Sequence, residues 1–266
     1  MTERHNRILE LLARKQRLEV SALANILAVS QVTIRKDLDY LEERELIRRE
    51  HGYALFGSLD DVGSRMALHY NVKRRIAKLA ALLVEEEETI MIESGSCCAL
   101  LAEELANTKP VTIVTNSAFI ANHIRHAPYA RVILLGGEYQ NSAQVLVGSM
   151  TRQCSEIFLS NKFFMGTDGF NEHYGFTGKN HLRAQTVREM AENVEQIIVL
   201  TESEKFLHKG SEGTVRTQDV SRIYTDEGIS RDKEAFLMEH SVAVFKVPGE
   251  TSQEQSFEEL PLVLWT

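Results

Sequence analysis

The chain has 266 residues, a hydrophobic content of 43% and a formal net charge of −8 at pH 7. This length predicts one small and one medium-sized domain, and the composition is typical of an ordered globular protein rather than a disordered one. No apolar run reaches 18 residues and the N-terminus has no apolar signal segment, so we expect a cytoplasmic protein without a membrane span. The three cysteines (Cys97, Cys98 and Cys154) have neither disulfide-framework nor zinc-ligand spacing, and we expect no metal and no cofactor.

The N-terminal part of the chain has the apolar spacing of three short helices. We expect Thr2 to cap the first helix and Ser21 to cap the second, because these hydroxyls accept hydrogen bonds from free helix N–H groups. A tight turn at Ala28-Val29 then leads to the third helix. This order of helix, short helix, turn and helix is typical of a helix-turn-helix, which presents its last helix to the major groove of DNA.

The third helix, predicted over residues 30–41, carries the clearest indication of function. Ser30 is expected to cap it, and its apolar residues recur at i, i+4 and i+7 on one face, at Ile34, Leu38 and Leu41. The remaining side chains therefore project outward, and they are Gln31, Val32, Thr33, Arg35 and Lys36. A small helical bundle with a charged, solvent-exposed face has the same spacing, so this alternative stays open on the pattern alone.

A β-hairpin wing is predicted after this helix, over residues 47–55, with a turn at Gly52. Total charge does not decide between DNA binding and the alternative, since residues 1–55 have a net charge of +1 and the rest of the chain −9. The placement of charge is more informative. Four basic residues lie on the helix and wing that would approach DNA phosphates, at Arg35, Lys36, Arg48 and Arg49.

Residues 4–55 resemble the winged helix-turn-helix of DeoR-family transcriptional regulators. The family pattern is a Ser, two variable residues and Thr-Ile-Arg-Arg-Asp-Leu, which residues 30–38 match, and residues 49–54 match its wing pattern. Lys36 replaces an arginine of that pattern and Tyr53 replaces a wing glycine. The resemblance implies repression through operator DNA, with base edges contacted by Gln31, Val32 and Lys36. The residues expected at backbone phosphates are Thr33, Arg35, Arg48, Arg49 and His51.

We place the DNA-binding domain at residues 1–56, a linker at 57–71, a larger domain at 72–247 and a C-terminal tail at 248–266. Short apolar strands are predicted in the larger domain at 89–92, 111–114, 131–135, 162–165 and 196–200. Helices are predicted between them at 72–84, 98–105, 118–126 and 181–193. This alternation indicates a parallel sheet covered on both faces. The fold class is α/β, a winged helix-turn-helix followed by a Rossmann-like parallel α/β effector domain.

The carboxyl ends of the predicted strands are small or polar, and ligands of open α/β sheets bind beyond such ends. Ser94-Gly95-Ser96 leads into a helix whose free N–H groups favour an anion, and Lys205 adds positive charge. His181 and Arg183 are either further anion ligands or ordinary surface residues, and generic βα loops are the alternative for the whole edge. The candidate effector-binding residues are Ser94, Gly95, Ser96, Cys97, Thr115, Asn116, Ser117, Gly136, Gly137, Asp168 and Lys205.

This second part, over about residues 72–247, resembles the DeoR-family effector domain, which is similar in fold to ribose-5-phosphate isomerase. The family motifs are matched at residues 93–97, 115–117, 136–137, 202–206 and 225–226, with departures at Glu93, Cys97 and Glu204. The resemblance implies a phosphorylated sugar or polyol as effector and a carbohydrate-metabolism operon as target. We expect a homodimer or homotetramer, because one winged helix-turn-helix reads too few base pairs for tight specific binding.

Two other functions fit parts of the sequence. An isomerase would need a base beside the substrate carbonyl, but the first acid of the isomerase pattern Asp-Gly-Ala-Asp is replaced by Met165, whereas the second is retained as Asp168. We therefore expect no enzymatic activity, although Glu172 and Glu202 lie near in sequence. A module that binds protein through its helix-turn-helix is the other alternative. The apolar end of the tail, residues 260–265, packs either on its own domain or on a neighbouring subunit.

Overall fold

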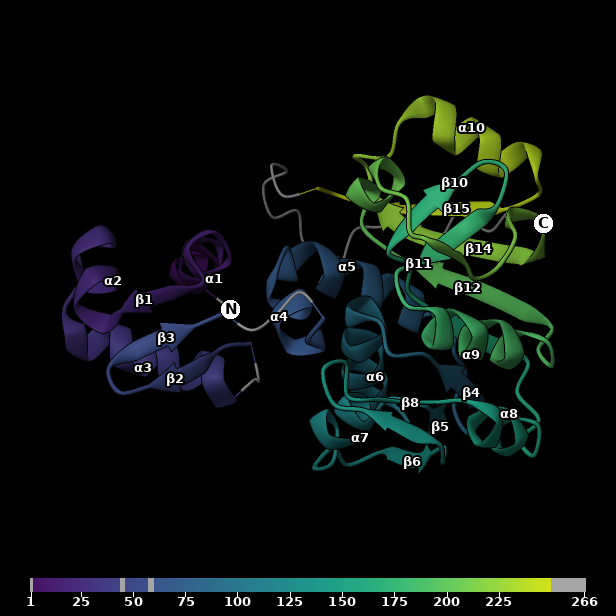
Figure 1. The fold of residues 1–266 in the computed structure, drawn as a ribbon, viewed down its shortest axis with the longest axis horizontal. Helices are drawn as coiled ribbons and strands as arrows, with labels where there is room; N and C mark the ends of the chain where they lie inside the picture. The colour runs from purple at the N-terminus through teal and green to yellow at the C-terminus, as the bar shows by residue number, and fades with distance from the viewer. Residues whose placement is uncertain (1, 44–45, 57–59, 250–266) are drawn as a thin grey trace.

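The computed structural model describes residues 2–43, 46–56 and 60–249, which form a small N-terminal domain and a larger α/β domain (Figure 1). The expectations for residues 57–59 of the linker and for residues 250–266 of the tail, with its apolar end, lie outside the described residues. No helix of the described ranges is long and apolar enough to cross a membrane.

The small domain contains the expected helices, with the strands of a wing. Thr2 caps the first helix by accepting a hydrogen bond from the His5 N–H, and Ser30 caps the third by accepting one from Thr33, as expected. The expected cap at Ser21 was wrong, because the second helix already begins at Val20, with Glu19 in the N-cap position, directly after a three-residue strand too short to show a period. The elements are α1 (Glu3–Lys15), β1 (Arg17–Glu19), α2 (Val20–Ile26), α3 (Gln31–Glu43), β2 (Arg48–Glu50) and β3 (Tyr53–Leu55).

Helix α3 presents the face that its sequence predicts. Its apolar residues Ile34, Leu38 and Leu41 are fully buried against the other helices. The side chains on the opposite side are exposed or half-buried, and Val32 is 60% exposed although it is apolar. An exposed valine in the first turn of a helix adds nothing to the core, so its side chain is free to contact a partner.

The wing is a tight hairpin in which β3 lies between β1 and β2. Glu50 pairs with Tyr53, and the two residues between them, His51 and Gly52, have φ angles of 42° and 85°. Both lie in the left-handed region that two-residue hairpin turns of type I′ require, and glycine adopts it without strain. The Arg17 guanidinium lies 3.8 Å from the centre of the Tyr53 ring, so the tyrosine that replaces the family's glycine fixes the wing to β1 by a cation–π contact.

A buried carboxylate joins the first and third helices. Asp37 of α3 accepts two hydrogen bonds from the Arg4 guanidinium, at 2.6 and 2.9 Å, and lies 3.1 Å from the His5 ring nitrogen. Burial raises the pKa of Asp37, but the hydrogen bonds from Arg4 and His5 outweigh it, and the pKa lies below its usual value. The ionised carboxylate therefore stabilises the packing of α1 on α3.

The larger domain is built on a seven-stranded sheet in which every neighbouring pair is parallel, in the order β15-β14-β12-β9-β4-β5-β6. The five predicted strands are all present, and two more follow them at the edge of the sheet. The strands are β4 (Thr89–Ile92), β5 (Val111–Thr115), β6 (Ala130–Leu134), β9 (Lys162–Met165), β12 (Gln196–Leu200), β14 (Val220–Asp226) and β15 (Ala243–Val247). The expectation of a parallel α/β fold is confirmed.

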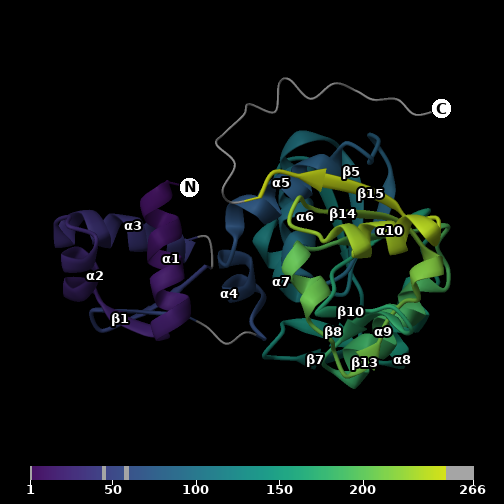
Figure 2. The same cartoon turned by 90° about the horizontal axis from the view of Figure 1, so that it is seen from above.

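Both faces of this sheet are covered (Figures 1 and 2). Successive side chains of a strand point to opposite faces, so Ile90 and Ile92 enter one core and Met91 enters the other. The first core lies under α4 (Val62–Ala67), α5 (Tyr70–Ala81), α6 (Ser96–Thr108) and α7 (Ala118–His123). The second lies under α9 (His181–Ala191), α10 (Arg231–Glu239) and an antiparallel sheet of β10 (Gly169–Asn171), β11 (Gly175–Gly178) and β13 (Glu212–Gly213).

A hairpin, a short helix and two 3₁₀ turns complete the domain. The hairpin β7 (Glu138–Gln140) and β8 (Val145–Val147) is followed by helix α8 (Ser149–Ser155). The 3₁₀ turns are η1 (Ser203–Leu207) and η2 (Thr217–Asp219).

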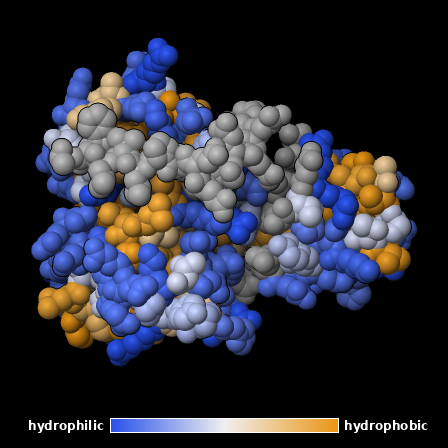
Figure 3. All heavy atoms as spheres, turned by 180° about the vertical axis from the view of Figure 1, so that it is seen from behind, coloured by the Kyte–Doolittle hydropathy of each residue, from blue (hydrophilic) through white to orange (hydrophobic). Residues whose placement is uncertain are grey.

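The rear face of the molecule is mostly hydrophilic, with separate hydrophobic groups on both domains (Figure 3).

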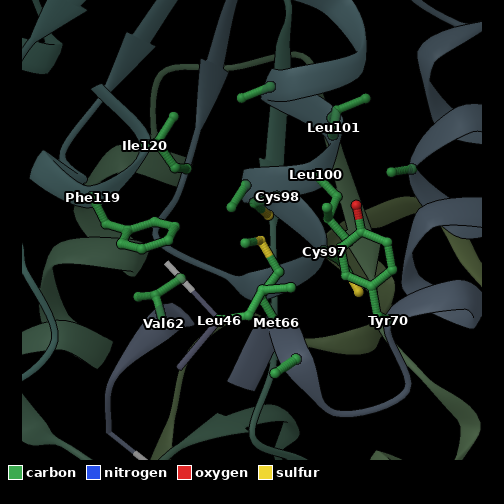
Figure 4. Close-up of a cluster of buried hydrophobic side chains, with 14 of the residues drawn as sticks. Leu46, Val62, Met66, Tyr70, Cys97, Cys98, Leu100, Leu101, Phe119 and Ile120 are labelled. Carbon is green, nitrogen blue, oxygen red and sulfur yellow. The ribbon is translucent and has the colours of Figure 1, made fainter. Parts of the chain in front are cut away.

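Part of the expected linker belongs to the core of the larger domain. Helix α4 lies inside the predicted linker of residues 57–71, and its Val62 and Met66 are buried. Figure 4 shows these two side chains beside Leu46, which follows the recognition helix, and beside Cys98 and Phe119 of the larger domain. The linker prediction is therefore corrected for α4. Four of its six residues are small or polar, so the sequence shows no helical period, although Val62 and Met66 pack in the core.

We predict that Asp37→Asn destabilises the small domain by about 2 kcal/mol, since it removes charge-assisted hydrogen bonds from a buried site. A depressed pKa in the folded state means that the stabilisation is present above the unfolded-state pKa, near pH 4, and is lost as pH falls through the folded-state value. Chemical unfolding of wild type and Asp37→Asn at pH 7 and pH 3 measures this. The two should differ most at pH 7 and less at pH 3, whereas Glu19→Gln, at an exposed position, should change little at either pH.

Candidate functional site

The order of the strands places a ligand site between β4 and β9. The chain runs from β4 outward through β5 and β6, then returns across β4 to β9 and continues outward on the other side. The loops that follow β4 and β9 therefore leave the sheet in opposite directions and open a crevice at its carboxyl edge. A cavity of about 180 Å³ lies there, lined by residues 93–97 after β4 and 166–168 after β9.

Two glycines allow these loops to approach each other closely. A Cβ at Gly95 would lie 3.2 Å from both the N and the Cα of Gly166, and a Cβ at Gly166 would lie 3.3 Å from the Gly95 Cα. Backbone cannot move aside as a flexible side chain can, so both positions favour glycine. Glu93 joins the same loops, since its carboxylate accepts hydrogen bonds from the Ser94 hydroxyl at 2.9 Å and the Gly166 N–H at 3.2 Å. Burial raises the pKa of Glu93.

The first loop presents a helix N-terminus to the cavity. Ser94, Gly95, Ser96 and Cys97 all line the cavity, as expected, and α6 begins at Ser96 without a side-chain cap. The first N–H groups of a helix and its dipole favour an anion at this point. Burial raises the pKa of the Cys97 thiol, so the residue that replaces the family's threonine is a neutral group beside this helix end.

One buried ion pair forms the floor of the cavity. The Lys73 ammonium, on a side chain that is only 3% exposed, lies 3.1 Å from the Glu202 carboxylate. It also donates hydrogen bonds to the carbonyl oxygens of Arg65 and Leu68. An ammonium has three hydrogens, and three oxygen acceptors satisfy them. Lys73 therefore fixes the turn between α4 and α5 to the end of β12, and it is not available to a ligand.

Two arginines and a lysine supply positive charge to the cavity wall. Arg65 of α4 lies 4.0 Å from Asp168 and donates to the Ser94 carbonyl at 3.5 Å, and its Nε is buried without a partner among the described residues. Arg183, in the first turn of α9, also lines the cavity. Lys205 also lines the cavity, and its ammonium lies 3.4 Å from a carboxylate oxygen of Glu204. These cations surround the helix end that favours an anion.

Residues 225–226, at the end of β14, hold the loop that carries Lys205 in this wall. The Asp226 carboxylate accepts hydrogen bonds at 2.7 Å from both the N–H and the hydroxyl of Ser203, and one at 3.1 Å from Gly228. Ser203 begins the turn η1 that carries Lys205. The motif at 225–226 therefore positions the loop that bears the lysine, while its own carboxylate is used within the loop.

Five of the expected effector-binding residues do not line the cavity. They lie at or just after the ends of β5 and β6, beyond the crevice, and they are Thr115, Asn116, Ser117, Gly136 and Gly137. Most of their polar atoms bond to the local chain, whereas Asn116 Oδ1 is buried without a partner among the described residues.

The Thr115 hydroxyl accepts from the Ser117 N–H, and the Ser117 hydroxyl caps α7 by accepting from Ile120. The Asn116 amide donates to Leu146 of the β8 hairpin. Gly136 accepts from Thr151 through its carbonyl, and a Cβ on Gly137 would lie 2.1 Å from the Thr151 hydroxyl. These contacts shape the edge of the domain at the ends of β5 and β6.

Several cavity residues gave no signal in the sequence. Asp60, Arg65 and Lys73 come from the segment before the sheet, and Thr177 and Lys179 come from β11 and the residue after it. Arg183 was one of two open possibilities, and it lines the cavity. The other, His181, is not among the lining residues and lies 3.0 Å from Glu212.

The candidate DNA surface consists of the exposed side of α3 and the wing. Gln31, Val32, Arg35 and Lys36 are exposed on α3, and His51 is exposed at the tip of the wing. Arg48 is 75% exposed, and its guanidinium lies 4.0 Å from Asp61. Arg49 is held differently, since it donates to Asp39 of α3 and its N–H donates to Glu42, so it fixes the wing to the recognition helix.

We predict that Lys73→Met lowers the free energy of unfolding by about 3 kcal/mol, because it leaves the Glu202 carboxylate buried without its partner. The double variant Lys73→Met/Glu202→Gln should recover part of this loss. Lys78→Met, on the same helix, is the control. Thermal unfolding of the four proteins checks this, and equal stability of Lys73→Met and wild type would show that the pair does not support the cavity floor.

Comparison with known proteins agrees with both halves of the structure. Residues 4–58 match the DeoR-like helix-turn-helix domain, and residues 68–227 match the DeoR C-terminal sensor domain. The solved structure of ribose 5-phosphate isomerase A from Methanocaldococcus jannaschii has a TM-score of 0.37 and 17% identity, covering 52% of this chain and 55% of that one. At this TM-score the likeness is distant, and nothing further depends on it.

The relatives with curated descriptions are transcriptional regulators and match along most of their length. The regulator GolR of Listeria innocua is 28% identical over 86% of this chain and 92% of its own length. The glycerol-3-phosphate regulon repressor of Escherichia coli K12 is 28% identical, with coverages of 85% and 90%, and the transcriptional repressor AccR of Agrobacterium fabrum is 27% identical, with coverages of 85% and 90%. With both domains matched in order and over most of its length, the chain belongs to the DeoR family of transcriptional regulators.

Proposed function

We propose that this protein is a DNA-binding transcriptional repressor of a carbohydrate-metabolism operon, and that a phosphorylated sugar or polyol bound in the cavity sets its affinity for operator DNA. The observation that carries the effector class is the cavity itself, where the uncapped N-terminus of α6 meets Arg65, Arg183 and Lys205. A phosphate group suits the helix end and the cations, and the polar side chains around them suit hydroxyls. One relative is a repressor of the glycerol-3-phosphate regulon, which supports this class of target.

The proposed assignment of DNA contacts follows the exposed surface. Gln31, Val32 and Lys36 are the candidates for base edges, because they lie in the first turns of α3 and face outward. Thr33, Arg35, Arg48 and His51 are the candidates for phosphates. Arg49 is better described as a positioning residue, since its guanidinium is bonded to Asp39.

The same proposal includes a cytoplasmic location, where the DNA lies, and a homodimer or homotetramer built by the larger domain. The physical reason for the oligomer is that two recognition helices are needed to read two half-sites. Sedimentation of the free protein and of its DNA complex tests it, and a single copy in both states would reject it.

The proposal also holds that the chain is not an isomerase. Met165, at the position of the first acid of the isomerase pattern, is fully buried in the second core, and a thioether carries no transferable proton. Incubation of the protein with pentose and hexose phosphates checks this, and turnover would contradict it.

We predict that Arg35→Ala weakens binding to every DNA sequence and lowers the slope of log K against log salt by about 1, as expected for one lost phosphate contact. Fluorescence anisotropy with labelled duplexes at several salt concentrations measures both effects. Arg231→Ala, at an exposed position on α10, removes the same charge far from α3 and is the control. Unchanged affinity and slope in Arg35→Ala would mean that α3 does not lie on DNA as proposed.

A thermal-shift panel of sugar and polyol phosphates identifies the effector. A ligand at 100 times its Kd should stabilise the protein by about 2.7 kcal/mol. Lys205→Ala should weaken that ligand about tenfold to a hundredfold, because it removes a charge-assisted contact with the phosphate. Lys209→Ala, which changes an exposed lysine outside the cavity lining, should keep wild-type affinity, and equal losses in both variants would contradict the assignment of Lys205.

A further inference from the structure

The segment that joins the two domains contributes a carboxylate to the cavity. Asp60 lines the cavity, and its Oδ1 lies 2.7 Å from Nη1 of Arg183. Its other oxygen accepts a hydrogen bond from the Ser142 hydroxyl at 2.5 Å. Burial raises the pKa of Asp60, but the bonds from Ser142 and Arg183 outweigh it and the pKa is lowered, so the group is an anion at neutral pH. The carboxylate of Asp60 therefore already pairs with Arg183, one of the cations of the cavity.

Arg183 belongs to the ligand site by position. It lies in the first turn of α9, and its side chain is 21% exposed on the cavity wall. A guanidinium binds carboxylate and phosphate with the same fork of N–H donors. Arg65, on the same wall, has a buried Nε without a hydrogen-bond partner in the described ranges, and its charge also acts on Asp60. A phosphate between these two arginines would meet donors that Asp60 only partly uses.

The residue after Asp60 connects the same segment to the DNA-binding domain. Asp61 caps α4, accepting from the Gly63 N–H at 3.1 Å and from the Ser64 hydroxyl at 3.2 Å. Its carboxylate also lies 4.0 Å from the guanidinium of Arg48, on strand β2 of the wing. A displacement of Asp60 therefore also moves the adjacent Asp61, which caps α4 and contacts Arg48 of the wing.

We propose that Asp60 is an internal competitor of the effector: the carboxylate of Asp60 and the phosphate of the ligand use the same guanidinium, Arg183, so that ligand binding releases the segment between the domains. The inference rests on the proposed effector site and adds the means by which its occupation reaches the DNA-binding domain. It requires no change in the sheet or in the cavity floor, where Lys73 stays bonded to Glu202. Competition of this kind is reciprocal, since whatever holds Asp60 on Arg183 opposes the ligand by the same free energy.

The test uses full-length protein, with inorganic phosphate as the probe, and two measurements. Calorimetry gives the affinity for phosphate, and hydrogen exchange gives the opening of residues 60–64, the part of the segment that precedes Arg65. In wild type, phosphate should speed exchange in this segment. Asp60→Asn should bind phosphate about tenfold more tightly, within the usual range of such couplings, and should exchange fast in this segment without phosphate. Arg183→Gln should bind phosphate weakly, and adding Asp60→Asn to it should restore nothing.

Two further variants separate competition from a simple change of charge and from misfolding. Glu204→Gln removes another carboxylate of the cavity lining, one outside the interdomain segment, so the hydrogen exchange of residues 60–64 in this variant should remain that of wild type. Ser142→Ala removes only the second bond of Asp60, at an exposed position of the β7–β8 turn, and should raise phosphate affinity by a smaller factor.

The outcomes distinguish this inference from the proposed function. If Arg183→Gln loses phosphate but Asp60→Asn and Ser142→Ala bind it as wild type does, the effector site stands and the competition is rejected. If Asp60→Asn binds phosphate more tightly while exchange over residues 60–64 never changes, charge alone accounts for the gain and the inference is again rejected. If neither wild type nor Asp60→Asn binds phosphate, the anionic effector site itself is contradicted.

Discussion

The reversal of strand order between β4 and β9 is the constraint on which the rest of this molecule depends. It opens a crevice at the carboxyl edge of the sheet. At its base the backbones of Gly95 and Gly166 lie in direct contact. Only then do the N-terminus of α6 and the loop after β9 lie side by side. The cations that complete the cavity come from elements on either side of this point, so the charge of the site follows from the topology of the sheet.

The sequence predicted those parts of the fold whose signal is local. Continuous apolar runs located β4, β5 and β12, and the spacing of Ile34, Leu38 and Leu41 located the recognition helix. Strands β14 and β15 were missed, because polar residues interrupt them at the edge of the sheet. Helix α4 was taken as linker for a similar reason.

The candidate site was predicted only in part, because its composition depends on strand order. Residues 94–97 follow β4 at the reversal, and their chemistry sufficed to place them. Residues 115–117 have the same small, polar character but lie at the end of β5, one strand away from the crevice, where the hydroxyls of Thr115 and Ser117 bond within the turn and cap α7. Asp60, Arg65 and Lys73 precede the sheet in sequence and reach the cavity only through tertiary packing. No local sequence pattern therefore predicts that they line it.

A short segment links the DNA-binding domain to the cavity of the larger domain. At one end, Asp37 and Arg49 fix the recognition helix to its neighbours, so the small domain moves as a unit. At the other, the cavity has a rigid floor and a wall of cations, one of which is bonded to the interdomain segment. Because the DNA-binding domain and the cavity are both held rigid by these contacts, the segment that begins at Asp60 is the element whose two arrangements a ligand can bias.

The most direct test of this linkage is the affinity of one phosphorylated sugar, measured by calorimetry on the free protein and again on its complex with DNA selected from a random pool. Binding at two coupled sites must be reciprocal, so the ligand's affinity should fall on DNA by the same factor by which the ligand weakens DNA binding. Equal ligand affinities with and without DNA would show that the cavity does not control the recognition helix.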